Sequence, residues 1–148
     1  MKRVFTAALV CTAYASGAFA LSPCETNGYT TQLTSSSSPT LAVAITGKQI
    51  NANSLGGENW KEIHCDSTTG HAGQLQKVGV SPTDPVDPQT QVGNWSISDD
   101  TVNYNYGTGG NYYWRVYTNG TNLCWQEDSD TGGIIATGTV GAAIDCVP

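Results

Sequence analysis

The sequence predicts an all-β protein: a small antiparallel β-barrel or sandwich with a C-terminal meander, stabilised by disulfides. Three observations lead to this prediction. Short runs of alternating polar and apolar residues recur along the chain, and turn residues separate them at short intervals. In addition, no stretch of about 12 or more residues has a helical period. Consecutive strands with short turns are typical of antiparallel sheets.

The first half of the chain contains fewer clear strands. Residues 40–46 form a short apolar run that fits either a strand or one to two helical turns. A turn is expected over residues 51–59, which have two glycines at their centre. Residues 60–65 alternate large apolar and polar side chains, which predicts a half-buried strand, and residues 74–80 are a further strand candidate.

The second half predicts a continuous meander. Three prolines within residues 81–91 favour an extended surface connection. Strands are then expected at residues 94–98, 101–106, 111–117, 121–126 and 134–140. Tight turns are expected between them at 99–100, 107–110 and 119–120.

The chain begins with the three parts of a secretory signal peptide. Lys2 and Arg3 form a basic start, an apolar stretch of small residues follows, and residues 18–20 match an A-x-A cleavage site. We therefore expect residues 1–20 to be removed by cleavage near Ala20. This predicts a secreted or periplasmic bacterial protein in an oxidising compartment.

The mature chain is expected to contain one domain. Residues 21–39 are polar and rich in serine and threonine, which predicts an N-terminal arm attached only through Cys24. Residues 40–148 are long enough for a single β domain with its own core. No Phe or Met occurs beyond residue 20, so that core must be built from Trp, Tyr and aliphatic side chains.

Charge and hydropathy exclude two classes of partner. The formal net charge is −6, all 12 acidic residues lie beyond the signal peptide, and no cluster of Lys and Arg occurs. Such a chain repels phosphate backbones, so no nucleic-acid partner is expected. No apolar run after cleavage approaches the roughly 20 residues of a spanning helix, so no membrane span is expected.

The four cysteines beyond the signal peptide are predicted to form two structural disulfides. They are Cys24, Cys65, Cys124 and Cys146, and they allow three connectivities that sequence alone does not separate. Because Cys124 and Cys146 flank the last hairpin and the tail, we favour Cys124–Cys146 together with Cys24–Cys65. Each bridge is expected to contribute about 2–4 kcal/mol.

One group of side chains has the composition of a metal site. Glu62, His64 and Asp66 alternate along one strand face and could meet His71 across a turn, which would suit zinc or copper. The spacing matches no known site, and the same alternation describes a strand face in contact with solvent. We prefer that simpler interpretation and expect no metal and no cofactor.

A second acidic segment resembles the beginning of a calcium loop. Asp128 and Asp130 alternate before a glycine, but Thr139 stands where an EF-hand loop has its bidentate glutamate. An acidic β-turn is the preferred interpretation.

The aromatic residues of the meander provide the candidate binding surface. Within residues 111–117, alternation predicts a core-facing set made of Tyr112, Trp114 and Val116. It predicts an opposite face made of Tyr113, Arg115 and Tyr117, which could bind a glycan or a partner protein. The alternative is that the aromatic side chains only stabilise the sheet by cross-strand packing.

Several motifs, taken in order, resemble a group of small, uncharacterised exported proteobacterial proteins. The motifs are DPVDP at 84–88, VGNWS at 92–96, YNYGTGG at 104–110, and an upstream WKEIH at 60–64. Cys124 and Cys146 match a cysteine at a strand end and one near the terminus. The resemblance covers about residues 45–146, but the chain lacks the cysteine that the pattern places near Ile50. It implies export and an all-β fold, and it implies no activity.

The function expected from the sequence is recognition and not catalysis. The motifs G-x-S-x-G, H-E-x-x-H and the phosphate-binding loop are absent from the sequence. We therefore expect a secreted, non-enzymatic module that binds a glycan or a protein surface. The first alternative is a structural protein that self-associates, because few charges oppose strand pairing. The second is a periplasmic inhibitor of a hydrolase, because the negative charge of this chain would suit a hydrolase with a basic surface.

Overall fold

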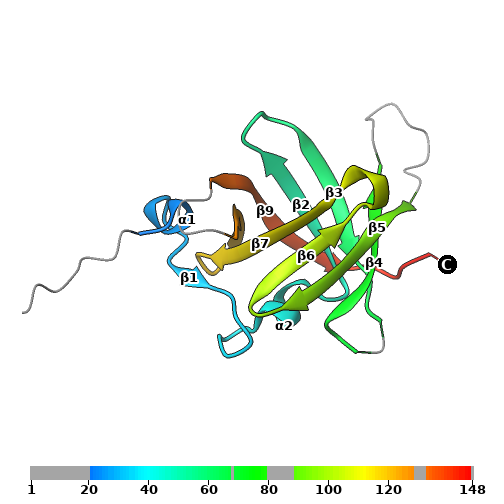
Figure 1. Cartoon of the computed structure of the whole chain (residues 1–148), viewed down its shortest axis with the longest axis horizontal. Helices are drawn as coiled ribbons and strands as arrows, with labels where there is room; N and C mark the ends of the chain where they lie inside the picture. The colour runs from blue at the N-terminus through cyan, green and yellow to red at the C-terminus, as the bar shows by residue number, and fades with distance from the viewer. Residues whose placement is uncertain (1–20, 68, 80–88, 129–132, 148) are drawn as a thin grey trace, which may run out of the picture.

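Eight antiparallel strands follow one another around a closed β-barrel in the computed structural model (Figure 1). The structure describes residues 21–67, 69–79, 89–128 and 133–147. The strands are β2 (Lys48–Ser54), β3 (Asn59–His64), β4 (Ala72–Val78), β5 (Gln89–Ser98), β6 (Thr101–Asn105), β7 (Asn111–Thr118), β8 (Asn122–Glu127) and β9 (Ile134–Ala143). Each strand pairs with the next, and β9 pairs back with β2. The predicted all-β fold is confirmed, as a barrel and not a sandwich.

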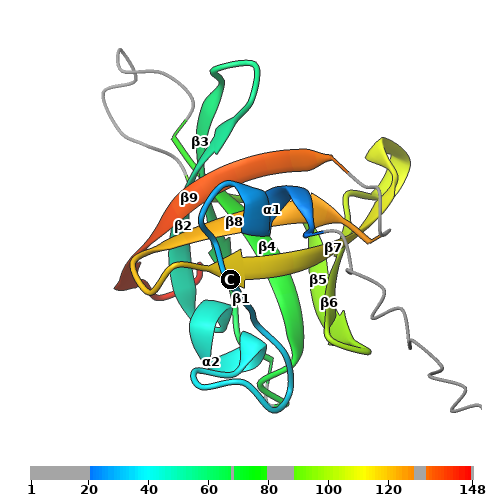
Figure 2. The same ribbon diagram turned by 90° about the vertical axis from the view of Figure 1, so that its left-hand side faces the viewer.

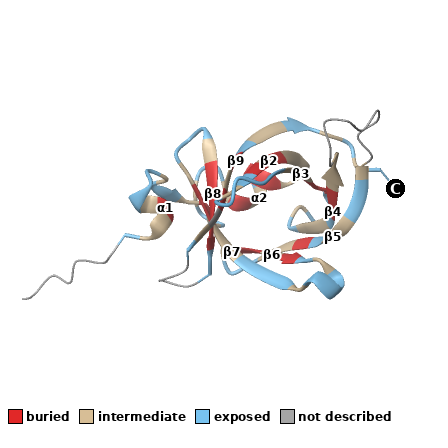
Figure 3. Cartoon of the chain, turned by 90° about the horizontal axis from the view of Figure 1, so that it is seen from above, coloured by how far each residue is buried: buried red, intermediate tan, exposed pale blue. Residues whose placement is uncertain are grey.

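Closure of the ring is visible from above in Figure 3, where the strands surround the buried residues. Gly138 lies at the seam between β9 and β2. A Cβ atom there would come within 2.5 Å of the Asn51 carbonyl oxygen, so only glycine permits this approach of the two backbones. The core inside the ring includes Trp95 and Trp125, both buried, and the described residues that build it contain no Phe or Met.

One segment differs from the expectation, and the structure decides between the two alternatives left open for another. Residues 51–59 were expected as a turn, but their first part completes β2, in which Ile50 and Ala52 face the core and asparagines alternate with them. The strand is held by pairing with both β3 and β9, which local composition does not reveal. The ambiguous run at 40–46 is helical: α2 (Leu41–Ile45) begins after Thr40, whose hydroxyl accepts a hydrogen bond from Val43 N at 3.3 Å.

Helix α2 closes one end of the barrel. Figure 2 shows it below the strands, at the end opposite the turn between β2 and β3. Leu41, Ala44 and Ile45 are buried and join the barrel core. The core also includes Leu33, which follows the short strand β1 (Thr31–Gln32), and β1 pairs with the C-terminal end of β7. The segment 21–39, expected as a polar arm held by Cys24, therefore also contributes a strand and a core residue.

The disulfides are Cys24–Cys124 and Cys65–Cys146, so the pairing that we favoured from the sequence is wrong. The reason is that α1 (Pro23–Thr26) packs against β8, where Cys24 N donates to the buried Gln126 Oε1 at 3.1 Å. This contact brings together residues 100 positions apart. Proximity along the chain therefore does not decide the pairing.

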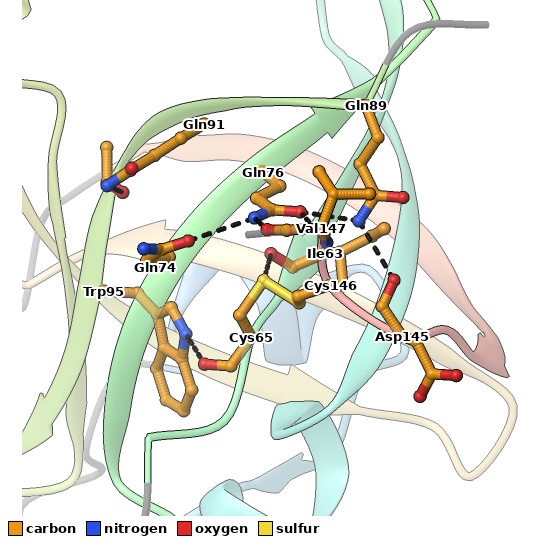
Figure 4. Close-up of a disulfide and its surroundings, with 11 residues drawn as sticks. Ile63, Cys65, Gln74, Gln76, Gln89, Gln91, Trp95, Asp145, Cys146 and Val147 are labelled. Carbon is orange, nitrogen blue, oxygen red and sulfur yellow. Dashed lines mark hydrogen bonds between the residues drawn. A yellow bond between two sulfur atoms is a disulfide. The ribbon is translucent and has the colours of Figure 1, made fainter.

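The second disulfide fixes the C-terminal tail across the outer face of β3 and β4 (Figure 4). Gln76 Nε2 donates to the Val147 carbonyl at 2.6 Å, and Val147 N donates to Gln76 Oε1 at 3.1 Å. Gln89 Nε2 donates to the Asp145 carbonyl at 3.2 Å. Beneath this tail Ile63, which points away from the barrel interior, is fully buried. The tail thus replaces solvent over the outer side of β3.

Two disulfides indicate an oxidising environment, either extracellular or periplasmic. None of the helices in the described part of the chain has the length and hydropathy of a transmembrane segment. The predicted signal peptide, residues 1–20, lies outside the described residues, as do residues 80–88 of the proline-rich connection.

Replacing Cys65 and Cys146 together by serine should lower the free energy of unfolding by about 2–4 kcal/mol, because the bridge closes a long loop and holds the tail over Ile63. Urea denaturation under non-reducing conditions measures the change. Peptide mapping of the unreduced protein provides the control for the pairing. A peptide that joins Cys24 to Cys65 would contradict the structure.

Candidate functional site

The barrel has a cavity of about 800 Å³ at the end opposite α2. Its walls come from β3, β4, β5 and the turn between β6 and β7. The side chains that shape it are Trp60, Glu62, Lys77, Val92, Tyr106 and Tyr112. A second, much smaller space of about 30 Å³ lies deeper in the barrel and shares Trp60, Glu62 and Tyr106 with the first. These three residues therefore separate the outer cavity from the closed interior.

Strand β3 supplies two polar side chains, Glu62 and His64, to the barrel interior. Trp60, Glu62 and His64 alternate along it and face inward. The predicted common face of Glu62 and His64 is confirmed, but the preferred interpretation of that face as solvated is wrong. On the outer side of the same strand Ile63 is covered by the tail, whereas Asn59 and Lys61 are exposed, so apolar residues occur on both of its faces.

The four residues considered for a metal site do not come together. Asp66 lies beyond the end of β3, is exposed, and accepts a hydrogen bond from Gly70 N at 3.1 Å. His71 is exposed in the turn before β4. Within the residues that the structure describes, no group of three His, Cys, Asp or Glu side chains could hold a metal ion.

A β-bulge directs Val92 into the cavity. Leu75 of β4 pairs with Gly93, whereas the next residue, Gln76, pairs with Gln91. Val92 is left as an extra residue on β5, and this irregularity turns its side chain toward the cavity. The cavity that Glu62 lines thus includes an aliphatic residue that strict alternation would have placed outside.

Glu62 is the central ionisable group of the cavity. The hydroxyl of Tyr106 donates to its Oε1 at 3.0 Å. Burial raises the pKa of the Glu62 carboxyl above its ordinary value, and Trp60, Tyr106 and Lys77 oppose this only in part. Lys77 is its direct partner in the register between β3 and β4. Ionisation of this buried carboxyl therefore costs free energy unless a further positive group or hydrogen-bond donor lies beside it.

Tyr112 forms an aromatic wall at the rim. Its hydroxyl donates to the Gly109 carbonyl at 2.8 Å, which folds the ring over the turn between β6 and β7. Gly110 makes this possible because it has φ +106° and because a Cβ atom there would lie 3.3 Å from the tyrosine hydroxyl. The rings of Tyr112 and Tyr106 have centroids 6.0 Å apart and an interplanar angle of 64°. They form a corner of two steeply inclined aromatic rings.

A hydrogen-bonded chain of three side chains lies in the closed interior. Trp125 Nε1 donates to the Tyr104 hydroxyl at 3.2 Å, and this hydroxyl lies 2.8 Å from His64 Nε2. The direction of the hydrogen bond between this hydroxyl and His64 is set by the imidazole tautomer, because a hydroxyl can accept two hydrogen bonds and donate one. Burial lowers the pKa of His64 to about 3, and the backbone of Lys48 opposes this only in part. His64 is therefore neutral at physiological pH.

The predicted binding face of Tyr113, Arg115 and Tyr117 is not one open surface. Tyr113 is 55% exposed, and Arg115 Nε donates to Asp128 Oδ1 at 2.8 Å. Tyr117 is only 4% exposed, because it packs against the Cys24–Cys124 disulfide beneath α1. A ligand on this side would reach Tyr113 and Arg115 but not Tyr117. Asp128 is thus part of an ion pair, and Asp130 lies outside the described residues.

Tyr112 was expected to fill the core but is 43% exposed at the cavity rim. Alternation gives the side of the sheet correctly, yet it does not distinguish the packed middle of a barrel from its open end. The signal that sequence reasoning missed is the position of Tyr112 just after the turn glycine Gly110. A turn glycine marks the end of a strand, so a ring beside it lies at the mouth of the barrel and not in its packed middle.

Comparison with protein-family models, with curated proteins and with solved structures finds no match to this chain. The function is therefore argued from the geometry of the barrel and its cavity.

Acidification should destabilise the protein through His64. The unfolded imidazole titrates near pH 6.5 and the buried one near pH 3. Between these values the unfolded chain binds the additional proton, so the free energy of unfolding falls as the pH falls, by up to about 1.4 kcal/mol per pH unit. Above pH 6.5 this contribution is fully present and constant.

Urea denaturation of the wild type and of His64→Gln at several pH values between 3 and 6.5 gives the free energy of unfolding of each. The effect is the difference between the two proteins in how steeply this free energy changes with pH. Glu62 has the opposite sign, because its raised pKa favours folding of the protonated form, and it is present in both proteins. Equal slopes for the two proteins would contradict the buried, neutral state of His64.

Removing the hydroxyl of Tyr104 should also destabilise the barrel. Tyr104→Phe leaves Trp125 Nε1 and His64 Nε2 without their partner in the closed interior. The expected loss is about 2 kcal/mol or more, since each unsatisfied buried group costs about 1–3 kcal/mol. Thermal denaturation compares it with Tyr106→Phe, whose hydroxyl reaches the edge of the cavity. A larger loss for Tyr106→Phe would argue against the interior chain of hydrogen bonds.

Proposed function

We propose that this protein is a secreted, non-enzymatic binding protein that holds one small ligand in the open end of its barrel. The observation that carries the proposal is the cavity of about 800 Å³, with aromatic and aliphatic walls and a few polar groups. Small-molecule sites commonly have about this volume and this composition, and eight-stranded barrels are wide enough for one small ligand.

Three features favour binding over catalysis. His64 is 1% exposed and has a pKa of about 3, so it supplies no base to the outer cavity. Among the described residues that line the outer cavity there is no Ser, Cys or His that could serve as a nucleophile or its base. The charged side chains that line the cavity are Glu58, Glu62 and Lys77, and they are suited to hold a ligand by charge and hydrogen bonds.

Two features favour this role over self-assembly. The barrel closes on itself through β9 and β2, so its eight strands pair on both sides in the described part of the chain. The extra strand β1 is only two residues long. Self-assembling sheets need long free edges, which full closure removes.

The predicted signal peptide supports the proposed location. Residues 1–20 would direct export, and the two disulfides would then form in the oxidising compartment. A secreted binding protein of this kind would meet its ligand outside the cytoplasm.

A screen by ligand-observed NMR tests the proposal with three classes of probe: neutral sugars, amines and carboxylic acids. Tyr112→Ala should weaken the binding of any hit by about tenfold, which corresponds to about 1.4 kcal/mol, because it removes a wall of the cavity. Tyr113→Ala is the matched control, since it removes the neighbouring exposed tyrosine from the outer face.

The two variants separate the cavity from the outer surface. Hits that are lost in Tyr113→Ala but kept in Tyr112→Ala would move the site to the outer face of β7. A screen in which all three classes fail to bind would contradict the proposed function.

A further inference from the structure

The chemistry of the cavity points to a class of ligand, and this argument rests on the proposed function. Its starting point is the Glu62 carboxylate. Its Oε1 accepts from Tyr106 and the Trp60 side chain also donates to the carboxyl group, while an ionised carboxylate can accept about four hydrogen bonds in all. Lys77 lies across from it in register, yet within the described residues no ion pair joins the two side chains. The acid thus has unused capacity for a positive partner.

The walls beside Glu62 also favour a positive charge. Trp60, Tyr106 and Tyr112 line the same cavity, and the last two rings meet at 64° with centroids 6.0 Å apart. Aromatic rings attract cations to their faces, and several inclined rings with a carboxylate form the usual surroundings of an alkylammonium group. Glu58 adds a second carboxylate among the lining residues.

We infer that the ligand carries a small organic ammonium group, which is held between the carboxylate of Glu62 and the rings of Trp60, Tyr106 and Tyr112. The class of ligand is a primary or methylated amine of low molecular weight. The ammonium supplies the charge that the buried carboxylate lacks, and the rings replace part of its hydration shell.

The alternatives fit the same residues less well. An anionic ligand would meet Glu58 and Glu62 with only Lys77 as a positive side chain among the described lining residues. A neutral sugar could stack on the rings, but it would leave the desolvated carboxylate without a counter-charge. A cationic group satisfies both the rings and the acid.

Binding should strengthen as the pH rises through the titration of Glu62. A cation binds the ionised carboxylate, and burial makes that form costly in the free protein, so binding releases a proton where Glu62 is still protonated. The groups that face Glu62 are Lys77 from β4, Tyr104 from β6, Tyr106 after it, Trp60 from β3 and Glu58, which precedes β3. Tyr104 and Tyr106 have raised pKa values and stay protonated throughout.

The decisive experiment compares ligands that differ only in charge. Choline is titrated against its neutral isostere 3,3-dimethylbutan-1-ol, and phenethylamine against 2-phenylethanol, with isothermal calorimetry or NMR shifts as the readout. We expect each cation to bind the full mature protein at least about tenfold more tightly than its neutral partner. Glu62→Gln, which keeps the shape and the acceptor oxygen for Tyr106, should reduce this ratio to about one.

Glu58→Gln and Tyr113→Ala are the matched controls. The first removes a rim carboxylate and should reduce the ratio much less than Glu62→Gln, and the second should leave it unchanged. A thermal melt of each variant confirms that it is folded. Because Glu62→Gln removes a buried charge, it should melt no lower than the wild type.

The outcomes distinguish this inference from the proposed function. One outcome is that the neutral isosteres or neutral sugars bind as tightly as the cations and that Tyr112→Ala weakens their binding. The cavity would then bind ligands, but the inferred preference for ammonium would be wrong. If the cations bind and Glu62→Gln does not change their preference, the role of Glu62 is wrong. If neither the cations nor any probe of the wider screen binds, the proposed function fails as well.

Discussion

The pairing of β9 with β2 turns a row of strands into a ring and thereby creates an interior. Before closure, each strand has one face toward an open side, and its polar residues can remain hydrated. After closure, the inward residues of all eight strands share one space, and every polar group in that space needs a partner within it. The site, the core and the position of the helix that covers one end all follow from this constraint.

The interior meets this constraint differently at its two levels. Near α2, Trp125, Tyr104 and His64 are joined in a single chain of hydrogen bonds, in which His64 Nδ1 is the atom that lacks a hydrogen-bond partner in the described part of the protein. Toward the mouth, the Glu62 carboxyl interacts with Tyr106 and Trp60 and has space beside it. Hydrogen-bonded chains make a core rigid, while a buried acid beside a cavity is typical of a place that a ligand completes.

The local parts of the fold could be predicted from the sequence, and the parts that depend on closure could not. The hairpins between residues 94 and 126 are set by alternation and by turns such as Asp99-Asp100 and Asn119-Gly120, which involve only neighbouring residues. Strand β2 is polar on one side and becomes a strand because two partners pair with it. The disulfide pairing, the inward direction of Glu62 and the cover over Tyr117 likewise depend on contacts between distant segments.

The tail that is bridged to Cys65 links the redox state of the protein to the wall of its cavity. Cys65 immediately follows β3, the strand that carries Trp60 and Glu62, so a covalent bond that persists only under oxidising conditions braces this strand from behind. The reduced chain lacks this brace and also the one at Cys24. Reduction therefore removes the covalent support of the cavity wall without altering any residue that lines it.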